Sequence, residues 1–208
     1  MPLVFEEPKN MSRDRSEIMN RRSGLMGWVD QVRYKEIYRQ VIGLLLVAVC
    51  AWVAEPGQQR ILIGFGIAIA GQLFRIFAAG TIFKNHKLAS SGAYALVRHP
   101  LYLGNILILG GFSLASGSLF AALVIIAFFA IWYPAAIRYE DAKLERIFED
   151  DWRNWSTGTN AVLPGKFSWQ ALTNAHWNAR QSLIRNGELY IAVYLVACAV
   201  WLWLRAPG

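Results

Sequence analysis

The sequence predicts an all-α fold, a polytopic transmembrane helical bundle with about five spans. Hydrophobic residues occupy 55% of the 208 positions and charged residues only 17%, whereas soluble globular chains carry about 25% charged residues. The charges are also segregated, because long stretches contain almost none of them. Five apolar stretches result, at about 41–54, 61–83, 101–115, 119–137 and 189–204.

These stretches differ in length. A helix needs about 20 apolar residues to cross the hydrocarbon core, and 61–83 and 119–137 satisfy this requirement. The first and last stretches need flanking Tyr and Trp residues to reach that length. The stretch 101–115 is shorter, and the Ser-Gly-Ser sequence after it predicts a helical hairpin with 119–137.

Basic residues predict the orientation of the bundle. If the N-terminus is cytoplasmic, the outer segments hold only Arg60 and Arg205, and Arg75 lies inside a span. The other eighteen of the 21 Lys and Arg residues then face the cytoplasm, as the positive-inside rule requires. The net charge of +7 is explained by anionic lipid headgroups. We therefore expect a multi-pass protein of a bacterial inner membrane or an endoplasmic-reticulum-type membrane, and no nucleic-acid partner.

The spans divide the chain into three parts. Residues 1–40 are mostly polar, so we expect a cytoplasmic N-terminal arm there, with a short interfacial helix near Trp28 and Tyr34. Residues 41–165 predict the membrane core, which ends in a cytoplasmic amphipathic helix over 138–155. Residues 166–208 predict a membrane-surface segment and the fifth span. Cys50 and Cys198 lie in apolar stretches without metal-ligand spacing, so no metal site is expected.

The segment that precedes 101–115 carries the first candidate site residues. Pro100 suits the first turn of a helix, which places Arg98 and His99 beside a helix N-terminus at the membrane surface. Free backbone N–H groups and the positive end of the helix dipole favour a carboxylate ligand there. Tyr102 follows on the same turn.

Acidic residues at the end of the fourth stretch form the second candidate. Glu140 and Asp141 follow 119–137 directly. A hairpin brings this end next to Arg98 and His99, about 40 positions earlier, so a zwitterionic ligand finds partners for both charges at one cytoplasmic mouth. Arg75 is the third candidate, because a charge inside a span usually faces a polar cavity.

Two motifs follow each other along the chain. The first contains Gly92, Tyr94, Arg98, His99, Pro100, Tyr102 and Gly104, and the second contains Glu140, Asp141, Leu144, Phe148, Trp152 and Trp155. Together they resemble the isoprenylcysteine carboxyl methyltransferase and phospholipid methyltransferase superfamily of integral-membrane enzymes, over about residues 61–165. Departures are Glu149 in place of a Gly, Trp152 and Trp155 in place of Tyr residues, and Ala136 where the prenylcysteine enzymes have a basic residue.

The resemblance implies a methyltransferase that uses S-adenosylmethionine without a Rossmann domain. Arg98, Glu140 and Arg75 are the expected catalytic residues, with Arg98 or Arg75 orienting an anionic acceptor. Aromatic faces of Tyr94, Tyr102 and Tyr133 are candidates for stabilising the sulfonium. The expected cofactor-binding residues are Tyr94, Ala95, Leu96, Val97, Arg98, His99, Pro100, Tyr102, Leu103, Glu140, Asp141 and Leu144.

The acceptor is expected to be lipophilic, since it has to reach a site that opens toward the bilayer: a prenylcysteine-type carboxylate, a lipid amine or a small thiol. Membrane lipids are expected neighbours, and no residue identifies a protein partner. Two other functions stay open. Sterol reductases share a related C-terminal architecture and a similar Arg-His-x-x-Tyr run but use NADPH. A membrane scaffold that keeps this fold without activity is the other alternative.

Overall fold

Helices dominate the computed structural model, which describes residues 36–55, 57–82, 88–165 and 168–205 and contains no strand in these ranges. The predicted all-α class is therefore confirmed. The predicted interfacial helix near Trp28 and Tyr34 lies outside the described residues. The helices are α3 (Glu36–Trp52), α4 (Gln58–Thr81), η1 (Gly92–Ala95), α5 (Pro100–Ser116), α6 (Leu119–Ser156), α7 (Trp169–Thr173), η2 (Gln181–Arg185) and α8 (Glu188–Leu204).

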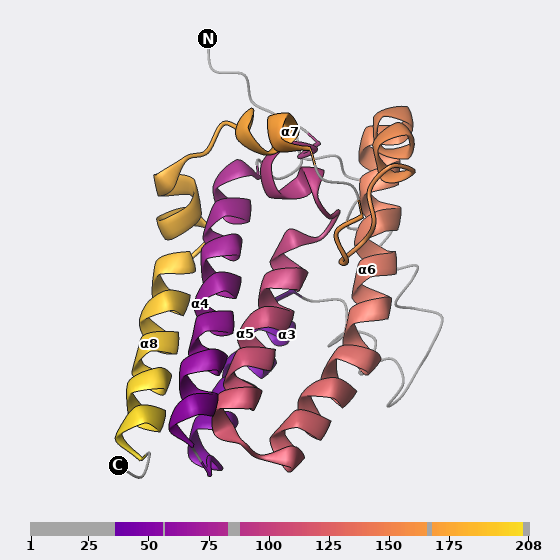
Figure 1. Ribbon diagram of the computed structural model, residues 1–208. Helices are drawn as coiled ribbons and strands as arrows, with labels where there is room; N and C mark the ends of the chain where they lie inside the picture. The colour runs from indigo at the N-terminus through magenta and orange to yellow at the C-terminus, as the bar shows by residue number, and fades with distance from the viewer. Residues whose placement is uncertain (1–35, 56, 83–87, 166–167, 206–208) are drawn as a thin grey trace.

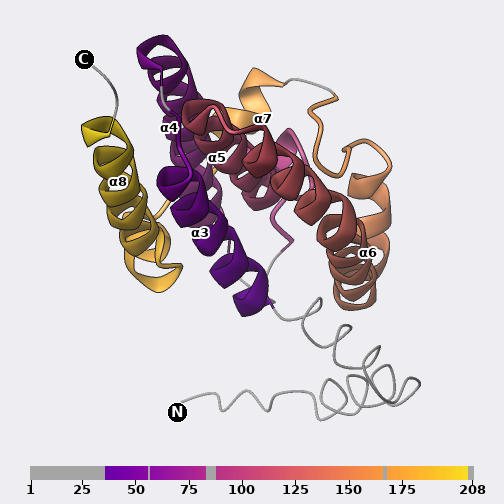
Figure 2. The ribbon, with the colours of Figure 1, turned by 90° about the horizontal axis from the view of Figure 1, so that it is seen from below.

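Five long helices form the bundle, with α8 and α6 at opposite sides and α3, α4 and α5 between them (Figures 1 and 2). Helices α4 and α5 approach each other most closely because glycines line their contact. A Cβ atom at Gly64 would lie 2.4 Å from the carbonyl oxygen of Gly111, and one at Gly71 would lie 2.8 Å from that of Gly104. Small residues of this kind let helix backbones touch in membrane bundles.

The predicted hairpin between α5 and α6 is present. Helix α5 ends at Ser116, and Gly117 adopts the left-handed conformation with φ 67° that favours glycine. Ser118 then caps α6 by accepting a hydrogen bond from Ala121 N at 3.3 Å. The start of α5 consequently lies beside the later part of α6 (Figure 1).

The amphipathic helix predicted over 138–155 is the later part of one longer helix. Helix α6 runs without a break from the apolar stretch through Glu140, and its irregularity comes later, at Glu149, with φ 44° and ψ −114°. This conformation is strained for a residue with a side chain and easy for glycine. It falls at the position where the resembling enzymes have a Gly.

Two of the helices, α4 and α6, are long and apolar enough to cross a membrane. The other apolar helices, α3, α5 and α8, contain 17 residues each. Several of their apolar side chains are exposed, among them Leu45 on α3 and Val193 and Val196 on α8. The lengths and exposed faces together indicate a membrane protein.

The segment between α6 and α8 caps the C-terminal end of α4. The last four carbonyl groups of a helix lack partners within it. Among them, the carbonyl of Ala79 receives a donor from this segment, and two more donors reach Ile76, about one turn earlier. Trp177 Nε1 and Ser182 Oγ donate to Ile76 O at 3.1 and 2.7 Å, and Asn186 Nδ2 donates to Ala79 O at 2.7 Å. These bonds hold the start of α8 against α4, a contact that the sequence did not predict.

Candidate functional site

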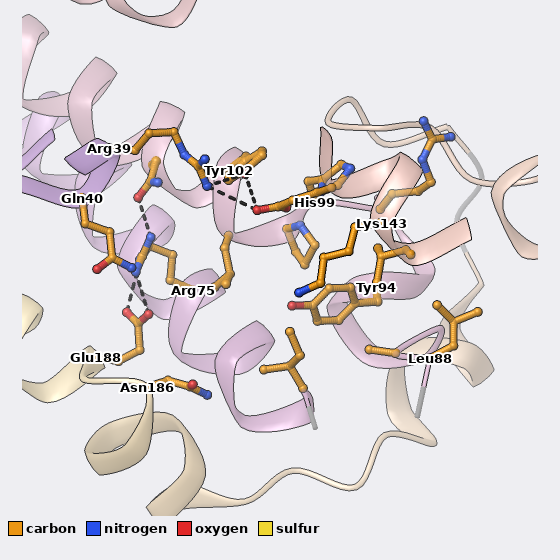
Figure 3. A pocket seen from close by; sticks show the side chains of 18 of the residues that line it. Arg39, Gln40, Arg75, Leu88, Tyr94, His99, Tyr102, Lys143, Asn186 and Glu188 are labelled. Carbon is orange, nitrogen blue, oxygen red and sulfur yellow. Dashed lines mark hydrogen bonds and ion pairs between the residues drawn. The ribbon is translucent and has the colours of Figure 1, made fainter. Parts of the chain in front are cut away.

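A cavity of about 550 Å³ opens among the starts of α3, α5 and α8 and the later part of α6. Figure 3 shows two groups of side chains around it: His99, Tyr102 and Arg39 in one, Arg75 and Glu188 in the other. The cavity is within the usual range for small-molecule sites, about 300–1,000 Å³.

The two sequence motifs meet at this cavity in one network, here called the motif cluster (Arg98, His99, Tyr102, Glu140 and Asp141). Tyr102 OH donates to Glu140 Oε1 at 2.6 Å. His99 lies between the two acids, with Nδ1 3.3 Å from Glu140 Oε2 and Nε2 2.8 Å from Asp141 Oδ1. Arg98 Nη2 donates to Asp141 Oδ2 at 2.9 Å. The hairpin thus brings Glu140 and Asp141 to Arg98 and His99, as predicted.

Arg39 of α3 joins this cluster, and the sequence analysis missed it. The only signal for it in the sequence is a basic residue before an apolar stretch. Its Nη2 lies 2.6 Å from Tyr102 OH and 3.3 Å from Glu140 Oε1. Its guanidinium carbon lies 5.0 Å from the centre of the Tyr102 ring, and His99 stacks on that ring at 5.2 Å. Tyr102 is therefore held by charged neighbours. Tyr94 and Tyr102 both line the cavity and Tyr133 does not, and the predicted contact of these rings with a sulfonium stays a prediction.

Burial and hydrogen bonding act in opposite directions on the pKa of His99. Burial disfavours the imidazolium, but hydrogen bonds to Asp141 and Glu140 and the charges of both acids outweigh it, so the pKa of His99 is raised. Burial likewise opposes ionisation of Glu140 and Asp141, yet hydrogen bonds with His99 prevail and the pKa of each is lowered. The cluster therefore favours an imidazolium between two carboxylates.

Part of the carboxylate site that the sequence predicted at the start of α5 is occupied by the protein itself. The backbone N–H groups of Arg98 and His99 donate to Asn160 O at 2.8 Å and Ala161 O at 2.9 Å. The side chain of Arg98 also donates to Thr159 O at 2.8 Å. The loop after α6 thus occupies these donors, and Arg98 holds that loop.

Lys143 is a cation of the cavity wall that has no acidic partner among the described residues. It lies one helical turn after Glu140 on α6 and appears beside Tyr94 in Figure 3. An ammonium group at this position can pair with a ligand carboxylate.

Arg75 is buried and paired with an acid that the sequence analysis missed. Arg75 Nη2 donates to Glu188 Oε1 at 2.7 Å and Nε to Oε2 at 3.2 Å. Gln72 Nε2 donates to Glu188 Oε2 at 3.0 Å, and Arg75 Nη1 donates to Asn105 Oδ1. The signal that points to Glu188 is the buried Arg75 itself, since a charge inside a span requires a partner.

The predicted binding residues divide into two sets. Arg75 lines the cavity, and so do Tyr94, Arg98, His99, Pro100, Tyr102, Glu140 and Leu144. Ala95, Leu96, Val97, Leu103 and Asp141 are not among the lining residues. Val97 is fully buried, and Asp141 acts on the cavity through Arg98 and His99. Their predicted contacts with a cofactor stay predictions.

A buried donor supports the fit of a nucleoside-type ligand. The indole Nε1 of Trp155 is buried and has no acceptor within the described part of the chain, and Trp155 lines the cavity. A heteroaromatic acceptor bound there would satisfy this N–H group. No group of three or more His, Cys, Asp or Glu side chains that could hold a metal ion occurs among the described residues.

Two relatives carry names that refer to metal resistance. The chain is 36% identical over 114 residues to the cobalt-zinc-cadmium resistance protein CzcN of Cupriavidus metallidurans, across 54% of this chain and 51% of that relative, so it matches about half of CzcN. It is 26% identical over 175 residues to the nickel-cobalt-cadmium resistance protein NccN of Alcaligenes xylosoxydans xylosoxydans, across 79% of this chain and 81% of that relative. No solved structure matches the chain significantly.

A family model described as phospholipid methyltransferase matches residues 38–151, more than half of the 208 positions. The matched segment includes Arg39, the start of α5 and the part of α6 that carries Glu140. It ends before α7, η2 and α8. The superfamily resemblance predicted from the two motifs is thereby confirmed, and the chain belongs to the phospholipid methyltransferase family.

Proposed function

We propose that this protein is an integral-membrane enzyme that transfers a methyl group from S-adenosylmethionine to a lipophilic acceptor. The observation that carries the proposal is the junction of the two motifs, where Glu140 meets His99 and Tyr102 at the wall of the cavity. Family membership supports the class of reaction. The donor, the acceptor and the residue roles are part of the proposal.

The donor would be held at the side of the cavity formed by the motif cluster and Lys143. S-adenosylmethionine supplies an electrophilic methyl group on a sulfonium. Glu140, with a side chain 34% exposed, accepts hydrogen bonds from the ammonium or the ribose hydroxyls. Lys143 binds the methionyl carboxylate. Trp155 Nε1 donates to the nucleoside.

The protein's contribution to the reaction is alignment and exclusion of water. Methyl transfer is an in-line displacement, so holding the reacting atoms in line accounts for much of the rate. The apolar residues Leu101, Leu144 and Phe148 line the cavity beside the charged groups and limit the access of water. No covalent nucleophile is required.

The membrane topology proposed here has five spans and a cytoplasmic N-terminus. Helices of 17 residues are about 25 Å long, close to the hydrocarbon core of about 30 Å. Exposed tryptophans occur at both ends of the bundle, Trp52 and Trp201 at one end and Trp169 near the other, as in an aromatic belt. The cavity then opens at the cytoplasmic face.

The acceptor is proposed to reach the cavity from the bilayer. The names of CzcN and NccN refer to resistance to cobalt, zinc, cadmium and nickel and specify no acceptor. A methyl-transfer assay answers the question directly: purified protein in lipid nanodiscs receives methyl-labelled S-adenosylmethionine and fractionated membrane lipids, and mass spectrometry identifies the methylated product.

We expect a labelled lipophilic product that the wild type forms and Glu140→Gln does not. The matched control is Glu145→Gln, which removes an exposed acid of the same helix that pairs with Arg153 at 2.9 Å. Absence of label in every fraction, together with binding of NADPH, would replace the proposal with the reductase alternative.

A further inference from the structure

The cavity has a second side that the motif cluster does not form. Arg75 and Asn105 come from within the segment that the family model matches, but Glu188, Asn186 and Arg185 come from after it. The capping of α4 by residues 177–186 places Glu188 against Arg75. The C-terminal part of this chain therefore supplies the acid, Glu188, that sets the net charge on this second side of the cavity.

The Arg75–Glu188 ion pair leaves neither oxygen of the Glu188 carboxylate without a donor. Both carboxylate oxygens of Glu188 accept hydrogen bonds, Oε1 from Arg75 and Oε2 from Arg75 and Gln72. The side chains of Arg75 and Glu188 are 5% and 2% exposed. The positive charge of Arg75 is thus balanced by a carboxylate that water barely reaches.

An anionic acceptor gains little binding energy from Arg75 while Arg75 is paired with Glu188. A carboxylate that enters a partly apolar cavity loses its hydration and needs an unpaired donor of opposite charge in return. Of the other cations that line the cavity, Arg39 pairs with Glu140, Arg98 with Asp141, and the His99 imidazolium with both acids. Arg185 is exposed and contacts Gln181, and Lys143 lies with Tyr94 on the donor side (Figure 3).

We propose that Glu188 is a specificity-determining residue that neutralises Arg75 and so excludes carboxylates, leaving uncharged nucleophiles as acceptors. This inference rests on the proposed methyl transfer and corrects the expectation that Arg75 orients an anion. With an uncharged amine, the nitrogen lone pair forms the bond to the methyl carbon while the carbon–sulfur bond breaks. The electron pair of the broken carbon–sulfur bond stays on sulfur, and the methylated ammonium product gives its proton to water.

Two ligands of equal size and different charge test the proposal, octanamide and octanoate. Calorimetry on full-length protein in zwitterionic nanodiscs measures both for the wild type, Glu188→Gln and the double variant Arg75→Gln/Glu188→Gln. The wild type should bind octanamide about tenfold more tightly than octanoate. Glu188→Gln should bind octanoate about tenfold more tightly than the wild type does, because Arg75 becomes available. The double variant should lose that gain, and Glu145→Gln should match the wild type.

The proposal is wrong if the wild type binds octanoate as tightly as octanamide, or if Glu188→Gln gains no affinity for octanoate. Should Glu188→Gln fail to fold, the double variant keeps the cavity neutral and should retain the wild-type preference for octanamide. Binding of S-adenosylhomocysteine, measured on the same samples, tests the methyltransferase proposal separately from the role of Glu188. If the wild type does not bind S-adenosylhomocysteine, the methyltransferase proposal is rejected, whatever the octanoate result.

Discussion

The two sides of the cavity are built from the same kinds of side chain but differ in burial and connectivity. In the motif cluster, Glu140 is 34% exposed, and Arg98 and Asp141 are 18% and 17% exposed. Each charge there has several neighbours. The Arg75–Glu188 pair is almost fully buried and joins two residues that are 113 positions apart in the chain.

This difference separates two roles for ion pairs. A partly exposed network exchanges partners at small cost, because water and ligand groups replace a lost contact. A buried pair cannot do so, because the loss of one partner leaves an uncompensated charge away from water. The motif cluster is therefore suited to binding a ligand, and the Arg75–Glu188 pair to fixing α8 and the charge of the cavity.

The largest expected effect is on the buried pair. Glu188→Ala should lower the free energy of unfolding by about 3–5 kcal/mol, because Arg75 keeps its charge without a partner. Arg75→Leu/Glu188→Leu should be close to the wild type in stability, since apolar residues of similar size replace buried pairs at little cost. Thermal unfolding in detergent, followed by tryptophan fluorescence, measures both. A double variant as unstable as Glu188→Ala would show that the pair is not the cause.

A smaller effect, on binding, is expected from Lys143. Lys143→Gln should weaken the binding of S-adenosylhomocysteine roughly tenfold, the cost of one charge-assisted hydrogen bond, and should leave thermal stability unchanged. Arg138→Gln is the control, because Arg138 is an exposed cation on the same helix that does not line the cavity. Equal losses in the two variants would mean that only the general positive field matters.

The motif cluster should also respond to pH. Because the folded protein raises the pKa of His99, its stabilising contribution is fully present below the unfolded value of about 6.5 and is lost as pH rises through the folded value. The lowered pKa values of Glu140 and Asp141 act at the acid end, where stability falls as these groups protonate. Between pH 6 and 9 the melting temperature of the wild type should therefore fall more than that of His99→Gln. Parallel curves would contradict this account of His99.

The smallest expected effect lies outside both regions, at Glu149. Its φ of 44° strains any residue with a Cβ atom, and Glu149→Gly should stabilise the protein by about 1 kcal/mol. Differential scanning fluorimetry would show this as a small rise in melting temperature. Unchanged or reduced stability would mean that the Glu149 side chain makes compensating contacts.

The sequence predicted the motif cluster better than the buried pair for a physical reason. Arg98, His99, Glu140 and Asp141 lie at the two ends of one hairpin, so helix lengths alone bring them together. Glu188 reaches Arg75 only because Trp177, Ser182 and Asn186 cap α4. No periodicity in the sequence reports such long-range contacts.

The backbone donors expected beside the start of α5 show the same limit of sequence reasoning. Pro100 correctly marked the first turn of the helix. The sequence did not show that Asn160 and Ala161 would occupy the N–H groups of Arg98 and His99. A helix end predicts unpaired donors but not which distant loop meets them.

Calorimetric titration of the purified protein with S-adenosylhomocysteine tests the central claim most directly. The wild type should bind at one site per chain, Glu140→Gln should bind at least about tenfold more weakly because it loses a charged acceptor, and Glu145→Gln should bind as the wild type does. A wild type that binds NADPH but not S-adenosylhomocysteine, or a Glu140→Gln variant with unchanged affinity, would contradict the donor site described for this cavity.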